Sequence, residues 1–435
     1  MRKRINALFS GMDLRGVIAT LAMRFAGAGV GFFGHVAYAR LLGQTHYGLY
    51  AGLWAWVVLL GMLAPLGLAM ANTRLAAQFL EKKQAGHLKG LFSFAVLMPL
   101  ISGAIFGAAF AAFEFATMQA DAPVNMTVAL VLAAVSIPLF ALGESMRGFA
   151  RGHGLTLLAY APAFLWRPLL ILVFALVAFA YLGQATVNVL MAASLLTLVA
   201  TVLVQAGLLR RHLDLPARLP AVRTPGAWLG IALPLLLMDG YFILAANTDV
   251  IVLRHFAPAE DVGAYYAATR IAALVNFFPL MIGAQAAPQM ARLWTRGERE
   301  LLIRIGRRYA WLAFLGTATA FTGLVWLGDI ALALFGRGFA VARPAMLILA
   351  GGIALQALSG PVRYLLAMCG QERAMAMVMS GAAILNVALN LVLIPAFGML
   401  GAAGATTLSN LALAAALACL AWRRLKIWVG VGPPM

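Results

Sequence analysis

The chain has 435 residues, of which 63% are hydrophobic and 11% charged, and its formal net charge is +18. A soluble domain of this length carries more polar surface, so the composition predicts an all-α protein that crosses a membrane many times. The two cysteines, Cys369 and Cys419, lie far apart in apolar runs, which argues against a disulfide framework or a zinc site.

The apolar runs define the predicted membrane spans. A helix needs about 20 residues to cross the ~30 Å hydrocarbon core of a bilayer. Twelve runs meet this length, at residues 15–40, 48–72, 88–113, 124–146, 155–182, 186–209, 226–253, 263–290, 305–327, 343–370, 374–396 and 400–422. The run near the N-terminus is interrupted by Arg24 and has no convincing cleavage site, so we interpret it as the first span and not as a removed signal.

The positive charge is distributed unevenly between the two sides of these spans. If the N-terminus is cytoplasmic, most of the 32 Lys and Arg residues fall in inner segments, and acidic residues lean outward. Membrane proteins retain basic residues on their cytoplasmic side, so the charge predicts topology and not nucleic-acid binding. We therefore expect twelve transmembrane helices, with the N- and C-termini both cytoplasmic.

A basic, proline-rich segment divides the chain into two halves. Residues 1–212 form a predicted N-terminal lobe of six helices, 213–225 a cytoplasmic linker, and 226–435 a C-terminal lobe of six helices. No loop is long enough to hold a soluble catalytic domain.

The halves show a weak internal repeat. Arg40 and Gly48 in the first half match Arg254 and Gly263 in the second, at a period of about 215 residues. Because each half has an even number of spans, both have the same orientation. This arrangement predicts a two-fold-like axis along the membrane normal and alternating access around a central cavity.

Four arginines fall inside predicted spans, namely Arg24, Arg167, Arg270 and Arg363. Charge at membrane depth is costly and usually faces an aqueous cavity, although Arg363 could instead extend to the lipid headgroups. Guanidinium groups match the geometry of a pyrophosphate, so the four residues predict an anion-binding cavity.

A second group of polar residues lies at one level of three spans. Asp249, Asn390 and Thr406 are placed at similar depths of predicted helices seven, eleven and twelve, and Asn386 lies one turn deeper. A carboxylate with neutral oxygens suits Na⁺ or a proton-carrying site. Alternatively, Asp249 faces outer water or a nearby arginine and the asparagines only join helices. Asp239 is a second candidate for the coupling carboxylate.

Glu144 is predicted to play a local structural part. It lies three residues before Arg147 on the same predicted helix, a spacing that favours an ion pair.

Several motifs carry a family resemblance. Near the C-terminus, Asn386-x-x-x-Asn390 is followed by Pro395 and then by Gly-x-x-Gly-Ala-Ala-x-Ala-Thr, which ends at Thr406. Predicted helix seven carries Asn247-Thr248-Asp249. The turn after the first predicted helix carries ARLLG and then YGLY. Together they resemble the Wzx-type oligosaccharide-lipid flippases of the MOP superfamily, which includes the MATE-like fold. The resemblance implies a V-shaped cavity between two six-helix lobes.

The resemblance also implies functional positions. In the related peptidoglycan-precursor flippases, a sodium site joins helices seven, eleven and twelve, and the matching positions are Asp249, Asn386, Asn390 and Thr406. Asn390 stands where those relatives carry an acid, so this site would have one negative charge fewer. The cationic cavity residues of the family match Arg24 and Arg270 best.

The sequence therefore predicts a flippase and not an enzyme. It would move an undecaprenyl-pyrophosphate-linked oligosaccharide across a bacterial inner membrane, for surface polysaccharide synthesis, with Na⁺ or H⁺ as coupling ion. Membrane lipids and polysaccharide polymerase machinery are the expected partners. One alternative is a MATE-type cation-coupled multidrug exporter, which should line its cavity with acids and aromatic rings. A second is a membrane polymerase or ligase of lipid-linked sugars, which needs a large outer loop. A third is a scaffold, which needs no intramembrane arginine.

Overall fold

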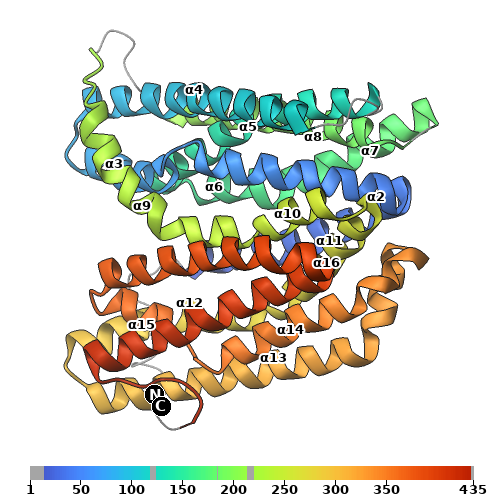
Figure 1. The fold of residues 1–435 in the computed structure, drawn as a ribbon. Helices are drawn as coiled ribbons and strands as arrows, with labels where there is room; N and C mark the ends of the chain where they lie inside the picture. The colour runs from blue at the N-terminus through green and yellow to red at the C-terminus, as the bar shows by residue number, and fades with distance from the viewer. Residues whose placement is uncertain (1–13, 118–123, 184, 213–219, 433–435) are drawn as a thin grey trace. The chain divides into compact units, whose positions relative to one another are not determined.

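The computed structural model describes residues 14–117, 124–183, 185–212 and 220–432. Within these ranges every regular element is a helix and no strand occurs (Figure 1). Helices satisfy their own backbone hydrogen bonds, which an apolar chain in a lipid bilayer requires. The predicted all-α class is confirmed.

Two helices are interrupted by a glycine. α2 (Leu14–Leu63) has non-helical angles at Gly43, with φ 71° and ψ 175°, and α16 (Glu372–Leu425) has them at Gly398, with φ 55° and ψ −130°. Glycine adopts positive φ at little cost, which allows the chain to change direction there. Each break separates two predicted apolar runs. Pro395 lies inside α16, and the break follows at Gly398.

The length and hydropathy of the described helices fit a protein with many membrane spans. Eight helices are long and apolar enough to cross a bilayer, and two bent pairs raise the number to as many as ten. The predicted count of twelve and the cytoplasmic termini stay predictions.

The first of two compact packing units comprises residues up to Ala37 and Leu60–Leu235. Its helices, beside parts of α2 and α9 (Pro225–Ala245), are α3 (Leu68–Glu81), α4 (Ala85–Thr117), α5 (Val124–Gly152), α6 (Thr156–Ala161), the π-helix η1 (Pro162–Trp166), α7 (Arg167–Leu182) and α8 (Val187–His212). Leu91, Phe149 and Trp228 lie in its buried core.

The second unit comprises Tyr38–Leu59 and Leu236–Met435. Its further elements are α10 (Thr248–Phe256), α11 (Ala259–Val275), α12 (Phe277–Thr295), α13 (Arg299–Phe335), the 3-10 helix η2 (Arg337–Ala342), α14 (Arg343–Ala357), α15 (Val362–Met368) and α16. Met290, Leu365 and Leu417 lie in its core. The unit thus includes a segment from the first half of the sequence. The predicted lobes were drawn from apolar runs and a repeat in the sequence, whereas these units are defined by packing. The division into six-helix lobes therefore stays a prediction.

The two glycines of the predicted repeat meet inside the second unit. A Cβ atom on Gly48 of α2 would overlap the backbone oxygen of Ala259 and lie 2.8 Å from the Gly263 nitrogen. A Cβ on Gly263 of α11 would lie 2.5 Å from the Gln44 oxygen and 3.1 Å from the Gly48 nitrogen. Each glycine therefore packs against the residue four positions before the other glycine. The contact is reciprocal, as expected where two copies of a repeated motif face each other.

Polar and aromatic contacts surround this glycine crossing. The Thr45 hydroxyl donates to Glu260 Oε1 at 2.6 Å, and the Gln44 amide donates to the Glu260 backbone oxygen at 3.1 Å. Tyr47 is fully buried, and its ring centroid lies 5.9 Å from that of Tyr266. The segment is therefore held to α11 by packing and by hydrogen bonds.

The glycine crossing predicts a stability effect of alanine substitution. Gly48→Ala or Gly263→Ala forces the two backbones apart, and we expect each to lower the free energy of unfolding by about 1–3 kcal/mol. Gly323→Ala on α13 is the matched control, because its Cβ position is open, and it should be neutral or stabilising. Melting of the purified protein in detergent measures the effect. Equal melting temperatures for all three variants would contradict the close crossing.

Candidate functional site

Asp249 is a buried carboxylate at a break between two helices. α9 ends at Ala245 and α10 begins at Thr248, with the Asn247 amide donating to the Ile243 backbone oxygen at 2.8 Å. The Asp249 side chain therefore lies in the first turn of α10, where the helix dipole favours a negative charge. The residue is 4% exposed, and its Oδ1 accepts from the Val250 backbone N–H at 2.8 Å.

Two hydroxyl groups from other helices also donate to this carboxylate. The Tyr265 hydroxyl of α11 donates to Asp249 Oδ2 at 2.6 Å. The Thr406 hydroxyl of α16 donates to the same oxygen at 3.4 Å. One buried carboxylate thus joins α10, α11 and α16. A carboxylate with three donors is well stabilised in an interior where an unpaired charge is costly.

The predicted asparagines connect to this site through Ser409. The Ser409 hydroxyl donates to the Thr406 backbone oxygen at 3.0 Å, and the Asn386 amide donates to Ser409 Oγ at 2.8 Å. Asn390 donates to the Asn386 backbone oxygen at 2.9 Å. Both asparagines are fully buried. Asp249 and Thr406 are therefore in direct contact, whereas Asn386 joins the two parts of α16 and Asn390 hydrogen-bonds to Asn386.

The oxygen atoms at Asp249 suit a proton or a small hard cation. Asp249, Thr406 and Tyr265 supply a carboxylate and two hydroxyls. The described residues contain no group of three or more His, Cys, Asp or Glu that could hold a metal ion. The chemistry at Asp249 thus fits a site with one negative charge and neutral oxygens.

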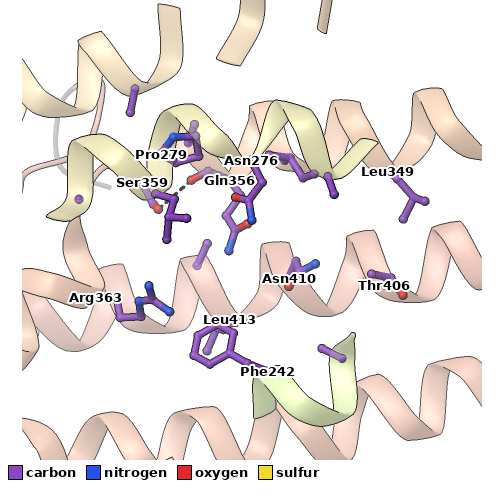
Figure 2. Close-up of a pocket in the computed structure, with 18 of the residues that line it drawn as sticks. Phe242, Asn276, Pro279, Leu349, Gln356, Ser359, Arg363, Thr406, Asn410 and Leu413 are labelled. Carbon is purple, nitrogen blue, oxygen red and sulfur yellow. Dashed lines mark hydrogen bonds between the residues drawn. The ribbon is translucent and has the colours of Figure 1, made fainter. Parts of the chain in front are cut away.

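A cavity of about 520 Å³ opens beside this carboxylate, within the second unit (Figure 2). Its polar lining includes Asp249, Arg270, Asn276, Gln356, Arg363 and Asn410. The cavity therefore contains two of the four predicted arginines and both contacting members of the predicted cation site.

The two arginines of the cavity lie on aromatic rings. The Arg270 guanidinium lies 4.3 Å from the Tyr266 ring centroid, and its buried Nε has no hydrogen-bond acceptor among the described residues. Arg363 lies 4.6 Å from the Phe242 centroid, and its Nη2 donates to the Tyr364 hydroxyl at 3.1 Å. Stacking fixes the planar groups and leaves N–H donors for an anion.

The remaining predicted residues lie on other helices, and the side chains of only some of them are described. Arg167 follows the π-helix η1 in the first unit, with its guanidinium 4.4 Å from the Phe140 ring and 3.9 Å from Glu144. Glu144 forms the predicted ion pair with Arg147, which is confirmed. Arg24 lies on α2 and Asp239 on α9, but the side chains of both are outside the described part of the structure.

Sequence comparison adds a family assignment to this geometry. A family model described as "Polysaccharide biosynthesis protein" matches residues 14–294, more than half of the chain. The chain belongs to this family. The resemblance predicted from the motifs around Asp249 and Asn386 is thereby confirmed.

One curated relative of this polysaccharide biosynthesis protein comes from Haloferax volcanii. It is named "Probable low-salt glycan biosynthesis flippase Agl15" and is 30% identical over 173 residues. The match covers 40% of this chain and only 36% of the relative.

Solved structures show the fold of this family member. An inward-facing multidrug resistance MATE transporter of the MOP superfamily matches with a TM-score of 0.71 and 17% identity, covering 91% of this chain and 98% of that chain. The lipid II flippase MurJ, in an inward closed conformation, matches with a TM-score of 0.71 and 12% identity, covering 94% and 87%. At such identities the likeness establishes the MOP-type fold alone.

Two contacts of the site were missed by sequence reasoning. Neither Tyr265 nor Ser409 is among the site residues that the sequence predicts. Hydroxyl-bearing residues are frequent in membrane helices, and nothing in their spacing shows which of them reaches a carboxylate on another helix.

The Tyr265 bond predicts a measurable cost when it is removed. Tyr265→Phe takes one donor from a buried carboxylate in this polysaccharide biosynthesis protein, and we expect the free energy of unfolding to fall by about 1.5–3 kcal/mol. The loss should be smaller in an Asp249→Asn background, because the charge is then absent. Unfolding in mixed micelles measures it, with Tyr181→Phe, at an 86% exposed position, as control. Equal losses in both backgrounds would contradict the contact.

Proposed function

We propose that the protein is a flippase that moves an undecaprenyl-pyrophosphate-linked oligosaccharide from the cytoplasmic to the outer leaflet by alternating access. Family membership and the MOP-type fold support a transporter of glycan biosynthesis. The name of the Haloferax volcanii relative points the same way. The proposed setting is a bacterial inner membrane, where the lipid substrate is made and where polysaccharide polymerase machinery would receive it.

The observation that carries the proposal is the charge of the cavity. Arg270 and Arg363 line it with their guanidinium planes held on aromatic rings, and Asp249 is the one acid among the described lining residues. The Asp249 charge already receives hydrogen bonds from Tyr265 and Thr406. The remaining donors suit an anion such as a pyrophosphate, which guanidinium groups bind in a bidentate manner. Arg24 and Arg167 are proposed as further phosphate-binding residues, on the first lobe.

The proposed architecture has twelve helices in two six-helix lobes with cytoplasmic termini. The glycine breaks of α2 and α16 support it, since each can separate two spans within one long helix. The reciprocal contact of Gly48 and Gly263 supports a repeat of one lobe by the other.

Asp249 is the proposed coupling carboxylate, and Na⁺ and H⁺ are both candidate ions. Arg270 attracts the Asp249 carboxylate, so a substrate phosphate at Arg270 and a coupling ion at Asp249 would each act on one member of a charge pair. A phosphate that engages Arg270 removes part of the compensation of Asp249 and thereby favours a cation there. Binding of substrate and ion is then linked, and the linkage acts equally in both directions. Asn386, Asn390 and Thr406 support the site from α16, and Asp239 remains the alternative carboxylate.

A multidrug exporter of the MATE type is the second candidate, because a MATE transporter shares the fold. Two arginines in the described cavity lining argue against organic cations as substrates. A polymerase or ligase is a weaker candidate, since the relatives named above are transporters and flippases.

Transport in proteoliposomes tests the anion site. Arg270→Ala and Arg363→Ala should each slow leaflet-resolved movement of a labelled undecaprenyl-pyrophosphate oligosaccharide about tenfold or more, as expected for loss of a charge-assisted hydrogen bond. Arg307→Ala, an exposed position on α13, is the matched control and should keep the native rate. Export of a cationic dye, together with no movement of the lipid, would reject the flippase proposal in favour of a drug exporter.

Ion gradients test the coupling carboxylate. We expect a Na⁺ or a pH gradient to accelerate the native protein, and Asp249→Asn to abolish the acceleration by whichever gradient is active, because the variant binds neither ion by charge. Glu300→Gln, an exposed acid on α13, serves as control. Full gradient dependence in Asp249→Asn would move the coupling site elsewhere, with Asp239→Asn as the next variant.

A further inference from the structure

Three carboxamide side chains line the cavity of the second unit and have no part in the anion or cation site. Asn276 lies at the bend between α11 and α12, Gln356 in the last turn of α14, and Asn410 on α16. Figure 2 shows their side chains around the same space, with Arg363 and Phe242 beside them. Three amides from separate elements in one cavity are a concentration of neutral hydrogen-bonding groups in an otherwise apolar lobe.

The amide of Asn410 has a fixed orientation. The buried Tyr241 hydroxyl donates to Asn410 Oδ1 at 2.5 Å, so the oxygen side of the amide is occupied. The Nδ2 group is the part that remains to donate to a ligand. Asn410 also lies one helical turn after Thr406, so the donor shares a face of α16 with the coupling site.

The amides of Asn276 and Gln356 have their full hydrogen-bonding capacity available. In the part of the chain that the structure describes, neither side chain hydrogen-bonds another protein group. The neighbouring Ser359 hydroxyl donates to the backbone oxygen of Gln356 at 2.8 Å and leaves its amide unused. Each amide offers two N–H donors and one oxygen acceptor. A hydroxyl group can accept a hydrogen bond from the amide and also donate one to it.

The size and composition of the cavity restrict the ligand. A volume of about 520 Å³ falls within the range of small-molecule pockets, roughly 300–1,000 Å³, and is too small for a whole oligosaccharide. Asp249, Arg270 and Arg363 are the charged groups among the described lining residues, and Leu413 and Leu417 make an apolar wall. The cavity thus combines an anion site, a neutral polar region and an apolar surface, which matches a phosphate-linked sugar ring.

We propose that Asn276, Gln356 and Asn410 form a carboxamide subsite that binds the hydroxyl groups of the neutral sugar residue attached to the pyrophosphate. The inference rests on the proposed flippase function and adds which sugar residue of the glycan the protein recognises. The arginines hold the pyrophosphate, and the carboxamides distinguish a hydroxyl-rich ring from a deoxygenated one. A site built to hydrogen-bond hydroxyl groups discriminates against a ligand lacking them, because its own polar groups are then left unpaired. Sugar residues farther along the glycan lie outside the subsite.

Paired lipid substrates test the subsite. The probes are undecaprenyl pyrophosphate carrying one neutral hexose, the same lipid carrying a dideoxyhexose, and undecaprenyl pyrophosphate without sugar. Transport in proteoliposomes and thermal stabilisation of the detergent-purified protein are measured for each. Gln356→Met and Asn276→Leu are the principal variants, because their side chains lack protein partners whose loss would disturb folding. Asn410→Leu is the third, and Gln78→Met, at an exposed position on α3, is the matched control.

The expected result separates sugar binding from phosphate binding. Each principal variant should raise the half-saturating concentration of the hexose-bearing lipid about tenfold, the value of one lost hydrogen bond to a ligand, and leave the sugar-free lipid unchanged. The native preference for hexose over dideoxyhexose should shrink in the same variants. Arg363→Ala should weaken both lipids together.

Two results would overturn the subsite without touching the flippase. The first is that the carboxamide variants reduce transport of the sugar-bearing and sugar-free lipids equally. The second is that they change transport of neither lipid. If the native protein moves no lipid at all, the flippase proposal fails, and the stabilisation measurements alone decide the subsite: equal stabilisation by the hexose-bearing and sugar-free lipids rejects it.

Discussion

A polar group buried in an apolar chain must find its hydrogen-bond partners within the protein, and this requirement organises the second unit. Asp249 is 4% exposed, and its partners come from its own helix and from two other helices. An ionised carboxylate in such surroundings is costly without donors, so loss of these hydrogen bonds would destabilise the unit. The positions of α10, α11 and α16 are therefore set partly by one side chain that also has the chemistry for coupling.

The same requirement explains the interior of α16. Its two parts are joined by a chain of side-chain contacts that runs from Asn390 through Asn386 and Ser409 to Thr406. Small polar residues with short side chains permit close helix packing and still satisfy one another. A movement of one part of α16 would thus be felt at Thr406, and through it at Asp249. This physical connection links the buried asparagines to Asp249, although neither is among the lining residues of the cavity.

The cavity of the second unit is lined by charges of both signs. Arg270 attracts Asp249, yet its Nε has no acceptor among the described residues. A phosphate at this arginine and a cation at the carboxylate would each change the environment of the other. The aromatic rings of Tyr266 and Phe242 hold the arginines in place, so little ordering is needed when an anion binds.

Much of the architecture followed from local sequence rules. Apolar runs of bilayer length gave an all-helical membrane protein, and glycines at 43 and 398 marked turns between predicted spans where the structure has breaks. Equal depth in three spans grouped Asp249 with Thr406, which are in contact. The same argument placed Asn390 beside them, but its amide turns to Asn386, because depth fixes the level of a residue and not the direction of its side chain.

The sequence by itself determined the class of the protein, its family and the residues that are too polar for their surroundings, because composition, periodicity and motifs are local properties. Only the tertiary structure decided which of these residues meet. It placed Arg270 and Arg363 in one cavity, gave Asp249 the Tyr265 hydroxyl, and added Asn276, Gln356 and Asn410. Contacts between helices that are distant in the chain depend on helix rotation and packing, which single-sequence patterns do not encode.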